Sequence, residues 1–445
     1  MELIGLIPSF GGFIYTVGAF IVALSVIVAV HEYGHYIVGR WSGIHPEVFS
    51  LGFGPVLYSR TDRRGTRWQI AALPFGGYVK FMGDADAASG KDGSTMSRLS
   101  PEELRRTMHG APLWARSATV AAGPAFNFAL SFLVFAAVLM VRGVASDPLT
   151  VDSLREMPGE VQELRPGDQV LSIGGSPAPG AEDFGEFVRN TPAEGIVTYT
   201  VRRDGSELSV SAPHPYPPIA AGVTPGSAAM DVGMTQGDVV LSVNGDPIQT
   251  FSELRDKVGD SEGKPLELEV WRAGEVLDIV LVPRRTDLPL PEGGFETRYL
   301  IGITGGLYFE PSTETPSLWA AAGYGVSQTI YIVQSSLSGL YHMAVGAISS
   351  CNLSGPIGIA ETSGAAASQG WTSFIWFIAV LSTAVGLLNL FPIPVLDGGH
   401  LVFHAYEAVT GRPPGDRALR VLMAAGLTVL LSLMAFALTN DLFCP

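Results

Sequence analysis

Charged residues are scarce in this chain. They make up 16% of its 445 residues, against 47% hydrophobic residues, and the mean hydropathy is +0.30. This composition points to a membrane protein that also has a substantial soluble part.

Cysteine and N-terminal basic residues are also scarce. The only two cysteines, Cys351 and Cys444, lack the spacing of a metal site, and the sequence leaves open whether they form a disulfide. The first residues include Glu2 and no Lys or Arg, so the basic region that opens a cleavable signal peptide is missing. We therefore expect no cleavable signal peptide.

Charges of the two signs are unevenly distributed. Residues 143–370 hold 12 basic and 29 acidic side chains, whereas residues 40–116 hold 11 basic and 7 acidic ones. Cytoplasmic loops of membrane proteins are enriched in Lys and Arg, so this asymmetry predicts that 40–116 lies inside and 143–370 outside. It also argues against a nucleic-acid partner.

Four apolar runs have the length of a membrane crossing, which takes about 20 helical residues. They cover approximately 13–38, 118–141, 371–390 and 421–438. A fifth stretch, 318–350, is only moderately apolar and contains Gln328, Gln334 and His342. We expect it to lie on the outer surface as a partly amphipathic helix. If it crossed the membrane, the first and third runs would cross in opposite directions, and the candidate metal ligands near their ends, described below, would lie on opposite sides.

Residues 29–36, with the sequence AVHEYGHY, match the pattern His-Glu-x-x-His at the end of the first apolar run. Imidazoles at positions i and i+4 project from one helix face, so His31 and His35 can bind a single tetrahedral Zn²⁺ ion. Glu32 lies about a hundred degrees around the helix and can accept a proton from a water molecule at the metal. One histidine at a helix end could merely reach the interface, but His, Glu and His together favour half of an intramembrane metal site.

A catalytic zinc site with two histidines needs a third protein ligand and an open position for water. Asp397 is the best candidate, because a carboxylate at the end of a membrane span is costly unless it is paired. Pro392 and Pro394 break the preceding helix and free backbone carbonyls there. Asn389 can hydrogen-bond a bound peptide or the developing oxyanion. A capping role for Asp397 is the alternative.

Other polar and Gly-rich features surround these motifs. The apolar stretch 71–81 reads as two short strands around a Pro-Phe-Gly-Gly turn, which either dips into the membrane or forms a soluble hairpin. Asn127, in a Gly-Pro-x-x-Asn sequence, serves either helix packing or the site. We expect His400 and His404 to pack locally or to support ligands rather than to bind the metal.

The acidic region contains an internal repeat. The sequence GDQVLSIGG at 167–175 recurs as GDVVLSVNG at 237–245, and YTVRRDG at 199–205 recurs as LEVWRAG at 268–274. Because the offsets are 70 and 69 residues, these are two copies of one small domain. Their order of elements resembles PDZ domains of the bacterial protease type, although the first copy is shortened at 151–163.

With these motifs the chain resembles the site-2 protease family of intramembrane zinc metalloproteases, of the bacterial RseP type. The resemblance rests on HExxH at 31–35, GFGP at 52–55, the stretch 69–82, GPxxN at 123–127, the repeat, NLSGP at 352–356 and NLFPIPVLDGGH at 389–400. It implies that His31, His35 and Asp397 bind Zn²⁺, that Glu32 is the general base and that Asn389 contacts substrate. It also implies single-pass membrane protein substrates, such as an anti-sigma factor already cut once and remnant signal peptides, in the bacterial inner membrane.

These observations predict a polytopic α-helical membrane protein with four transmembrane helices, a membrane-associated β-hairpin and two extracytoplasmic PDZ domains of α+β class. The expected divisions are a membrane half at 1–142, PDZ domains at 143–213 and 214–290, an extracytoplasmic connector with a surface helix at 291–370, and a second membrane half at 371–445. The active site is expected toward the cytoplasmic side. Lipid bilayer and membrane-protein substrates are the expected partners.

Two other functions compete with proteolysis. A membrane scaffold would use the PDZ copies to gather peptides around a structural metal, but structural zinc is normally closed by four protein ligands. A metal transporter would explain the intramembrane ligands and would leave the PDZ copies without a purpose.

Overall fold

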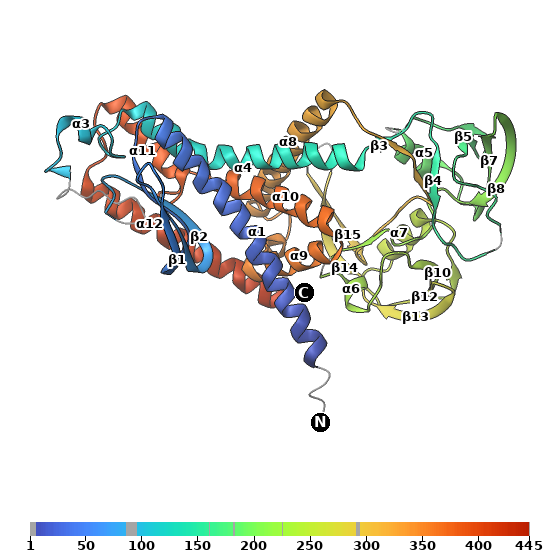
Figure 1. The fold of residues 1–445 in the computed structure, drawn as a ribbon. Coiled ribbons are helices and arrows are strands. Elements are labelled where there is room, and N and C mark those ends of the chain that lie inside the picture. Colours follow the sequence, from blue (N-terminus) through green and yellow to red (C-terminus); the bar gives the residue numbers. More distant parts are fainter. Residues whose placement is uncertain are drawn as a thin grey trace. The chain divides into compact units, whose positions relative to one another are not determined.

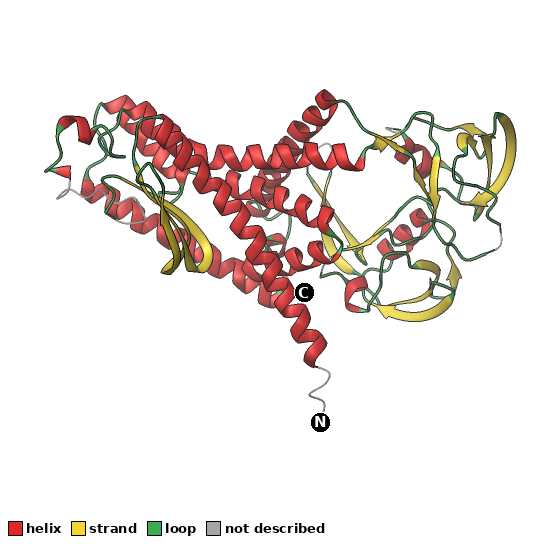
Figure 2. Ribbon diagram, viewed as in Figure 1, coloured by secondary structure: helices red, strands yellow, loops and turns green. Residues whose placement is uncertain are grey.

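The computed structural model describes residues 6–85, 96–159, 161–180, 183–224, 226–290 and 294–444. The chain forms two compact units. The helical unit comprises Met1–Val138, Trp319–Tyr341 and Ser350–Pro445, and the β-rich unit comprises Leu139–Leu318 and His342–Ser349. Helices make up most of the first unit, and most of the strands lie in the second (Figures 1 and 2).

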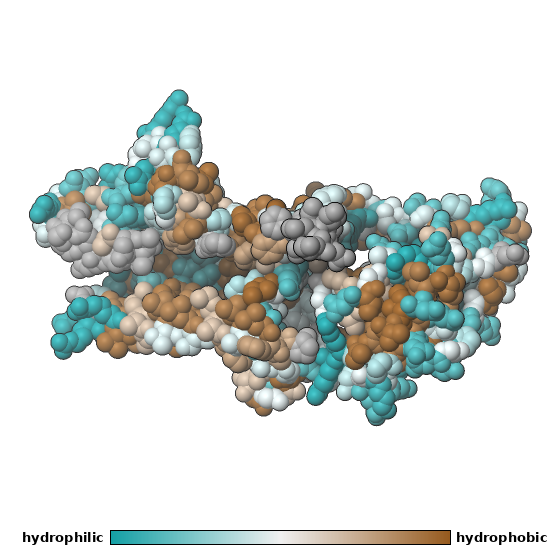
Figure 3. All heavy atoms as spheres, turned by 90° about the horizontal axis from the view of Figure 1, so that it is seen from below, coloured by the Kyte–Doolittle hydropathy of each residue, from teal (hydrophilic) through white to brown (hydrophobic). Residues whose placement is uncertain are grey.

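Four helices of the described residues are long and apolar enough to cross a membrane. They lie within α1 (Leu6–Trp41), α4 (Leu113–Arg142), α10 (Trp371–Asn389) and α12 (Asp416–Phe443). Each coincides with one of the four apolar runs in the sequence. A helix forms all its backbone hydrogen bonds internally, and this is necessary because lipid tails offer no hydrogen-bond partners. Apolar side chains also cover broad areas of the molecular surface (Figure 3), and α12 leaves many leucines and valines exposed.

The helices of the helical unit pack through small and branched side chains. Ala23 and Ile27 of α1 meet Ile378 of α10 in a buried cluster. Between α4 and α10, the Ser131 hydroxyl donates to the Ala379 carbonyl at 2.7 Å. The contact gives a buried hydroxyl a hydrogen-bond acceptor, as a helix interface within lipid requires.

The segment after α1 forms a small rolled sheet from β1 (Pro46–Thr61) and β2 (Arg67–Phe81). Residues 46–51 of β1 pair with 77–81 of β2 on one side, and 48–51 pair with 67–70 on the other, while 56–61 pair with 67–71. The chain reverses direction at the expected Pro-Phe-Gly-Gly turn, because 67–70 and 77–81 run in opposite directions. The two halves of β2 do not pair with each other, however, but with opposite sides of β1, and a second turn at 62–66 joins β1 to β2.

Aromatic packing fixes this sheet against α1. The Trp68 ring lies 4.4 Å from the Phe49 ring and 5.0 Å from the Tyr36 ring, between centroids. Tyr36 belongs to α1, one residue beyond His35, so the sheet is anchored beside the histidine motif. A short helix, α3 (Pro101–Leu104), with a Ser100–Glu103 capping box precedes α4.

The C-terminal part of the helical unit adds η1 (Ser350–Asn352), α9 (Pro356–Ser368) and α11 (Asp397–Thr410). Cys351 and Cys444 form a disulfide, which the sequence left open. The Asp441 carboxylate accepts hydrogen bonds from the backbone N–H groups of Gly355 and Ile357, at 2.7 and 3.0 Å. The end of α12 is thereby joined to η1 by a covalent bond and to the start of α9 by a cap.

The moderately apolar stretch forms α8 (Leu318–Ala344), which is not among the four helices that meet the criteria for a span in the described residues. Most of α8 belongs to the helical unit. Ala321 and Gly325 are its buried residues, and Gly325 lies against Phe132 of α4. The helix thus touches the others through small residues and exposes Trp319 and Tyr331.

The β-rich unit contains two four-stranded sheets with equivalent strand orders, β6-β5-β7-β8 and β11-β10-β12-β13. The strands of the first are β5 (Gln169–Ile173), β6 (Ser176–Pro177), β7 (Ile196–Arg203) and β8 (Ser206–Pro213). Those of the second are β10 (Val239–Val243), β11 (Asp246–Pro247), β12 (Leu266–Arg272) and β13 (Glu275–Leu281). Helices α5 (Phe184–Asn190), α6 (Ala228–Asp231) and α7 (Phe251–Gly259) accompany them. Both copies of the sequence repeat therefore have the same sheet.

Residues beyond the second copy supply a strand to each copy. β16 (Ile303–Thr304) pairs with β9 (Gly222–Val223), and β17 (Phe309–Pro311) pairs with the equivalent β4 (Val151–Leu154). Tyr308 and Phe309 are wholly buried in the core of the first copy. The second copy is therefore inserted within the first. The strands β3 (Val144–Ala145) and β18 (Thr313–Glu314) pair with each other, and β14 (Arg284–Pro289) with β15 (Phe295–Leu300) forms a separate hairpin.

Each copy has the same ion pair with a buried aspartate. Arg203 Nε and Nη2 donate to the two carboxylate oxygens of Asp168 at 2.7 Å, and Arg272 makes the same two bonds to Asp238 at 2.7 Å. Burial alone would raise the pKa of each aspartate, but the hydrogen bonds from its arginine and from a nearby backbone N–H lower the pKa below the ordinary value. The repeated Gly-Asp and Arg positions in the sequence are thus structural.

We expect Asp238→Asn to destabilise the β-rich unit more at neutral pH than in acid. A folded-state pKa below the unfolded value near 4 stabilises the fold above that pH, and the contribution disappears as pH falls through the folded pKa. Loss of hydrogen bonds to a charged group predicts about 1.5–3 kcal/mol at pH 7. Calorimetric unfolding of the full chain at pH 7 and pH 3 measures the loss of stability at each pH. Asp246→Asn, in an exposed pair with Lys257, is the control, and an equal loss in both variants would contradict the prediction.

Candidate active site

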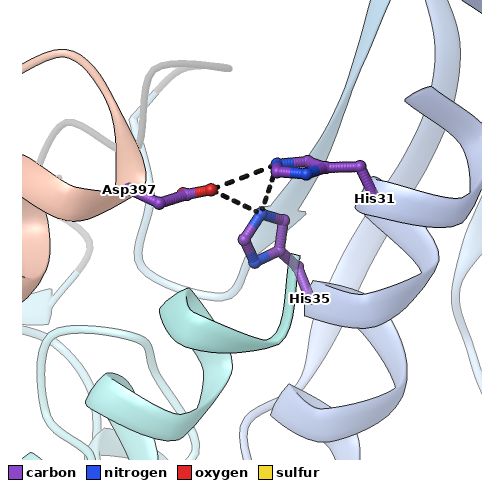
Figure 4. A group of neighbouring side chains, drawn as sticks. All are labelled: His31, His35 and Asp397. Atoms are coloured by element: carbon purple, nitrogen blue, oxygen red, sulfur yellow. Dashed lines mark hydrogen bonds and ion pairs between the residues drawn. The ribbon is translucent and has the colours of Figure 1, made fainter. Parts of the chain in front are cut away.

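His31 and His35 lie one turn apart on α1, and Asp397 faces them from the start of α11 (Figure 4). The two Nε2 atoms are 3.1 Å apart. Asp397 Oδ2 lies 3.1 Å from Nε2 of His31 and 3.5 Å from Nε2 of His35. Within the part of the chain that the structure describes, these residues form the only cluster of at least three His, Cys, Asp or Glu side chains able to hold a metal ion. The structure thus brings together the three residues that the sequence selected.

A tight turn brings Asp397 into this position. α10 ends at Asn389, residues 390–396 fold back, and α11 begins at Asp397 itself. A Cβ atom on Gly398 would lie 2.3 Å from the carbonyl oxygens of Leu390 and Phe391, closer than any real contact. Only glycine fits there, so the turn can close over the first residues of α11.

The three ligand atoms fit a zinc ion. Ligands about 2.0–2.2 Å from a tetrahedral zinc lie roughly 3.3 Å from one another, close to the separations observed here. Asp397 Oδ2 is buried and has no hydrogen-bond partner of normal geometry among the described residues. Two imidazole lone pairs and a carboxylate oxygen that converge in this way repel one another unless a cation lies between them. Three protein ligands leave a fourth position for water or substrate.

A cavity of about 250 Å³ contains the cluster. Its walls include Glu32, Asn389 and His400 with the strand residues 77–79. A Cβ atom on Gly77 would lie 3.2 Å from Cγ of Glu32. The β1–β2 sheet therefore borders the metal cluster beside Glu32. A second, larger cavity beside α1 and the sheet is almost wholly apolar and has no acid or base for catalysis.

The other polar residues selected from the sequence have distinct positions. Asn389 lines the cavity, with its amide nitrogen 3.1 Å from the Val385 carbonyl of its own helix. His400 also lines the cavity, and burial lowers the pKa of its imidazole. His404 lies farther along α11, with Nδ1 3.2 Å from the Ser117 hydroxyl. In the cluster of Figure 4, neither histidine joins the three ligands.

The sequence did not identify the role of α4. His35 Nδ1 lies 2.8 Å from the Thr119 carbonyl oxygen, and His31 Nδ1 lies 3.2 Å from the amide of Asn127. Both α4 residues are buried. The Gly-Pro-x-x-Asn sequence was the available signal. Whether its Asn127 serves helix packing or the metal site could be decided only by knowing which helix faces α1.

A partly buried ion pair holds α11 against α4. Arg116 at the start of α4 forms two hydrogen bonds to Glu407, at 2.6 and 3.0 Å. These hydrogen bonds lower the pKa of the Glu407 carboxyl, against a smaller opposing effect of burial. Because α11 carries Asp397 at its other end, this pair helps to fix the third ligand relative to α4.

Residues 19–433 match the sequence pattern of peptidase family M50. The chain is 37% identical over 427 residues to a protein of Agrobacterium fabrum named "Putative zinc metalloprotease Atu1380", covering 95% of this chain and 94% of that protein. It is 38% identical over 431 residues to a similarly named protein of Rhizobium meliloti, covering 96% of both.

A more distant relative carries a more specific name. The chain is 29% identical over 457 residues to the "Regulator of sigma-E protease RseP" of Salmonella typhimurium, covering 96% of this chain and 98% of that protein. The family pattern extends over both halves of the metal cluster. It confirms the resemblance drawn from the motifs: the chain belongs to peptidase family M50, the site-2 protease family.

Proposed function

We propose that this chain is an intramembrane zinc endopeptidase in which His31, His35 and Asp397 bind the metal and Glu32 is the general base. The convergence of the three ligand atoms in one cavity with Glu32 carries this proposal. The membership in family M50 and the names of the relatives support zinc as the cofactor. The position of both histidines in a helix of spanning length supports a site within the membrane.

The chemistry is hydrolysis of a peptide bond. Bound zinc supplies a Lewis acid that polarises the scissile carbonyl and acidifies water. Glu32 accepts a proton from the attacking water as its oxygen bonds to the carbonyl carbon, and then gives this proton to the amine when the C–N bond breaks. Glu32 lines the same cavity as the three ligands. Asn389 turns its amide from Val385 toward the substrate or the oxyanion.

The proposed substrates are single-pass membrane proteins, including an anti-sigma factor cut once before and remnant signal peptides. The name of the Salmonella typhimurium relative supports the first class. A substrate helix must unwind to present an extended segment, and its freed backbone groups need partners within the membrane. The outer side of 77–81 can pair with such a segment. Ile70 cannot pair with such a segment, because β1 residues pair with it on both sides.

A scaffold around a structural metal is the second candidate. The cluster offers three protein ligands where a structural zinc site normally has four, and a carboxylate lies beside them in the same cavity. Both features favour catalysis. Incubation of the purified full chain with single-pass membrane peptides, with and without a chelator, tests the proposal. Products that form only without chelator support it, and unchanged peptides under both conditions reject it for those peptides.

We further propose that the repeat forms two PDZ domains outside the bacterial inner membrane and that the metal site lies toward the cytoplasm. The first copy then comprises 143–213 together with the strand at 309–311 that pairs with β4. The acidic charge of 143–370 supports the outside location. The Cys351–Cys444 disulfide supports it independently, because disulfides persist in oxidising compartments such as the periplasm.

This topology predicts which engineered cysteines a membrane-impermeant thiol reagent reaches in intact spheroplasts. Cysteines at Ser206 and Ser368, both exposed, should react, whereas a cysteine at exposed Thr61 should react only after lysis. The native pair stays blocked as a disulfide. Residue Ser94, an attractive inside probe, lies outside the described residues. Labelling of Ser206 and Ser368 from opposite sides would mean that α8 crosses the membrane, and the proposed topology would have to be abandoned.

A further inference from the structure

We propose that Asn127 is a positioning residue that holds His31 in the tautomer and orientation needed for zinc binding, by accepting a hydrogen bond from His31 Nδ1 through its amide oxygen. The proposal rests on the zinc site described above and assigns a role to the Gly-Pro-x-x-Asn sequence, which the hydrolytic mechanism does not use.

Three residues of α4, at positions i, i+4 and i+8, face the two imidazoles. Thr119 presents its carbonyl oxygen to His35 Nδ1, and Asn127 presents its amide to His31 Nδ1. Between them, a Cβ atom on Gly123 would lie 2.3 Å from His35 Nε2 and 2.8 Å from His31 Cε1. Glycine is required there because both rings pack directly on the helix backbone. One face of α4 is thus shaped to the pair of histidines.

Metal binding dictates the tautomer of both rings. A neutral imidazole that offers the Nε2 lone pair to a metal carries its proton on Nδ1, and this N–H needs an acceptor. His35 has such an acceptor in the Thr119 carbonyl, at 2.8 Å. For His31 the group at Nδ1 is the Asn127 amide, at 3.2 Å. Only the amide oxygen can serve, because the NH₂ group would oppose one donor to another.

The amide can meet this requirement by a half-turn about χ2. In the structure Asn127 Nδ2 faces the imidazole, and the buried Oδ1 has no hydrogen-bond partner among the described residues. A half-turn exchanges the two atoms and gives that oxygen the His31 N–H. The side chain is wholly buried, so water does not replace this partner. The metal-bound state therefore selects the orientation with oxygen toward His31.

The backbone around Asn127 is also held. Its carbonyl accepts a hydrogen bond from the Ser382 hydroxyl of α10 at 3.1 Å, and both residues are fully buried. α10 leads directly into the turn that places Asp397. Asn127 thus connects the orientation of one metal ligand with the helix that precedes another.

The test measures zinc affinity of the full chain by competition with a chelator. We expect Asn127→Leu, which keeps the volume and removes the acceptor, to weaken zinc binding about 10–100-fold. Asn127→Asp supplies an acceptor that cannot donate, and it should bind zinc within a few-fold of the original chain. Thr383→Val removes a buried hydroxyl of α10 that bonds only within its own helix, and as the control it should leave zinc affinity unchanged.

Two results would overturn the proposal. The first is a folded Asn127→Leu protein with unaltered zinc affinity. The second is a folded Asn127→Asp protein that loses zinc, since this would make amide donation the essential contact. The Asp variant decides the question even if the Leu variant does not fold. Failure of the unmodified chain to bind zinc would instead reject the proposed function, so the two failures are distinguishable.

Discussion

Glu32→Gln should abolish peptide-bond hydrolysis and leave the metal site loaded. Glutamine keeps the size of the side chain, and the ligands His31, His35 and Asp397 are untouched. It cannot accept the proton of the attacking water, and loss of a general base costs about 10²–10⁴-fold in rate. Cleavage of a membrane peptide measures the first effect, and metal analysis of the purified protein measures the second.

A matched variant separates this effect from a general loss of acidic side chains. Glu47 lies on the sheet that borders the cavity, and its carboxylate pairs with Lys80 at 3.3 Å. Glu47→Gln is therefore the control. Glu47 does not line the cavity, and turnover should change less than about two-fold, as expected for a surface ion pair. Appreciable turnover by the Glu32→Gln protein would contradict the assignment of Glu32 as the base.

The metal cluster could be predicted because its signals are local. The i, i+4 spacing of His31 and His35 sets their geometry within a single helix. Asp397 stood out because a carboxylate between Pro, Gly and an apolar helix is costly without a cation. Each inference needed only a few consecutive residues, and the structure places all three side chains together.

Long-range pairing could not be read from local patterns. Residues 71–81 carry the turn signals Pro, Gly and Gly, and β2 reverses direction there, but its two halves pair with opposite sides of β1 and not with each other. In the β-rich unit, Phe309 completes the core of a copy whose other strands end about a hundred residues earlier. Such contacts depend on which distant segment closes a sheet edge, and periodicity within a segment carries no information about that.

The role of Asn127 was undecided for a similar reason. A polar side chain in an apolar helix predicts a partner inside the protein, but the residues of α4 alone do not show whether this partner is a helix backbone or a metal ligand. The answer came from the placement of α4 beside α1, where Gly34 lies against the Ala122 carbonyl and Gly123 lies against both histidines. The small residues of α4 predict that another helix approaches it closely, but they do not predict which helix.

Asp397→Ala is expected to remove the metal as well as the activity. The carboxylate supplies the only negative charge among the three ligands, and without it two neutral imidazoles remain one turn apart on α1. The loss of zinc affinity should exceed the about 10–100-fold typical of residues that only support ligands. Chelator competition on the purified full chain measures it directly. Glu361→Gln, which removes an exposed carboxylate of α9, is the control and should keep its zinc. Full occupancy and tight binding in a folded Asp397→Ala protein would place the third ligand elsewhere, and the assignment of Asp397 would fail while that of Glu32 could still stand.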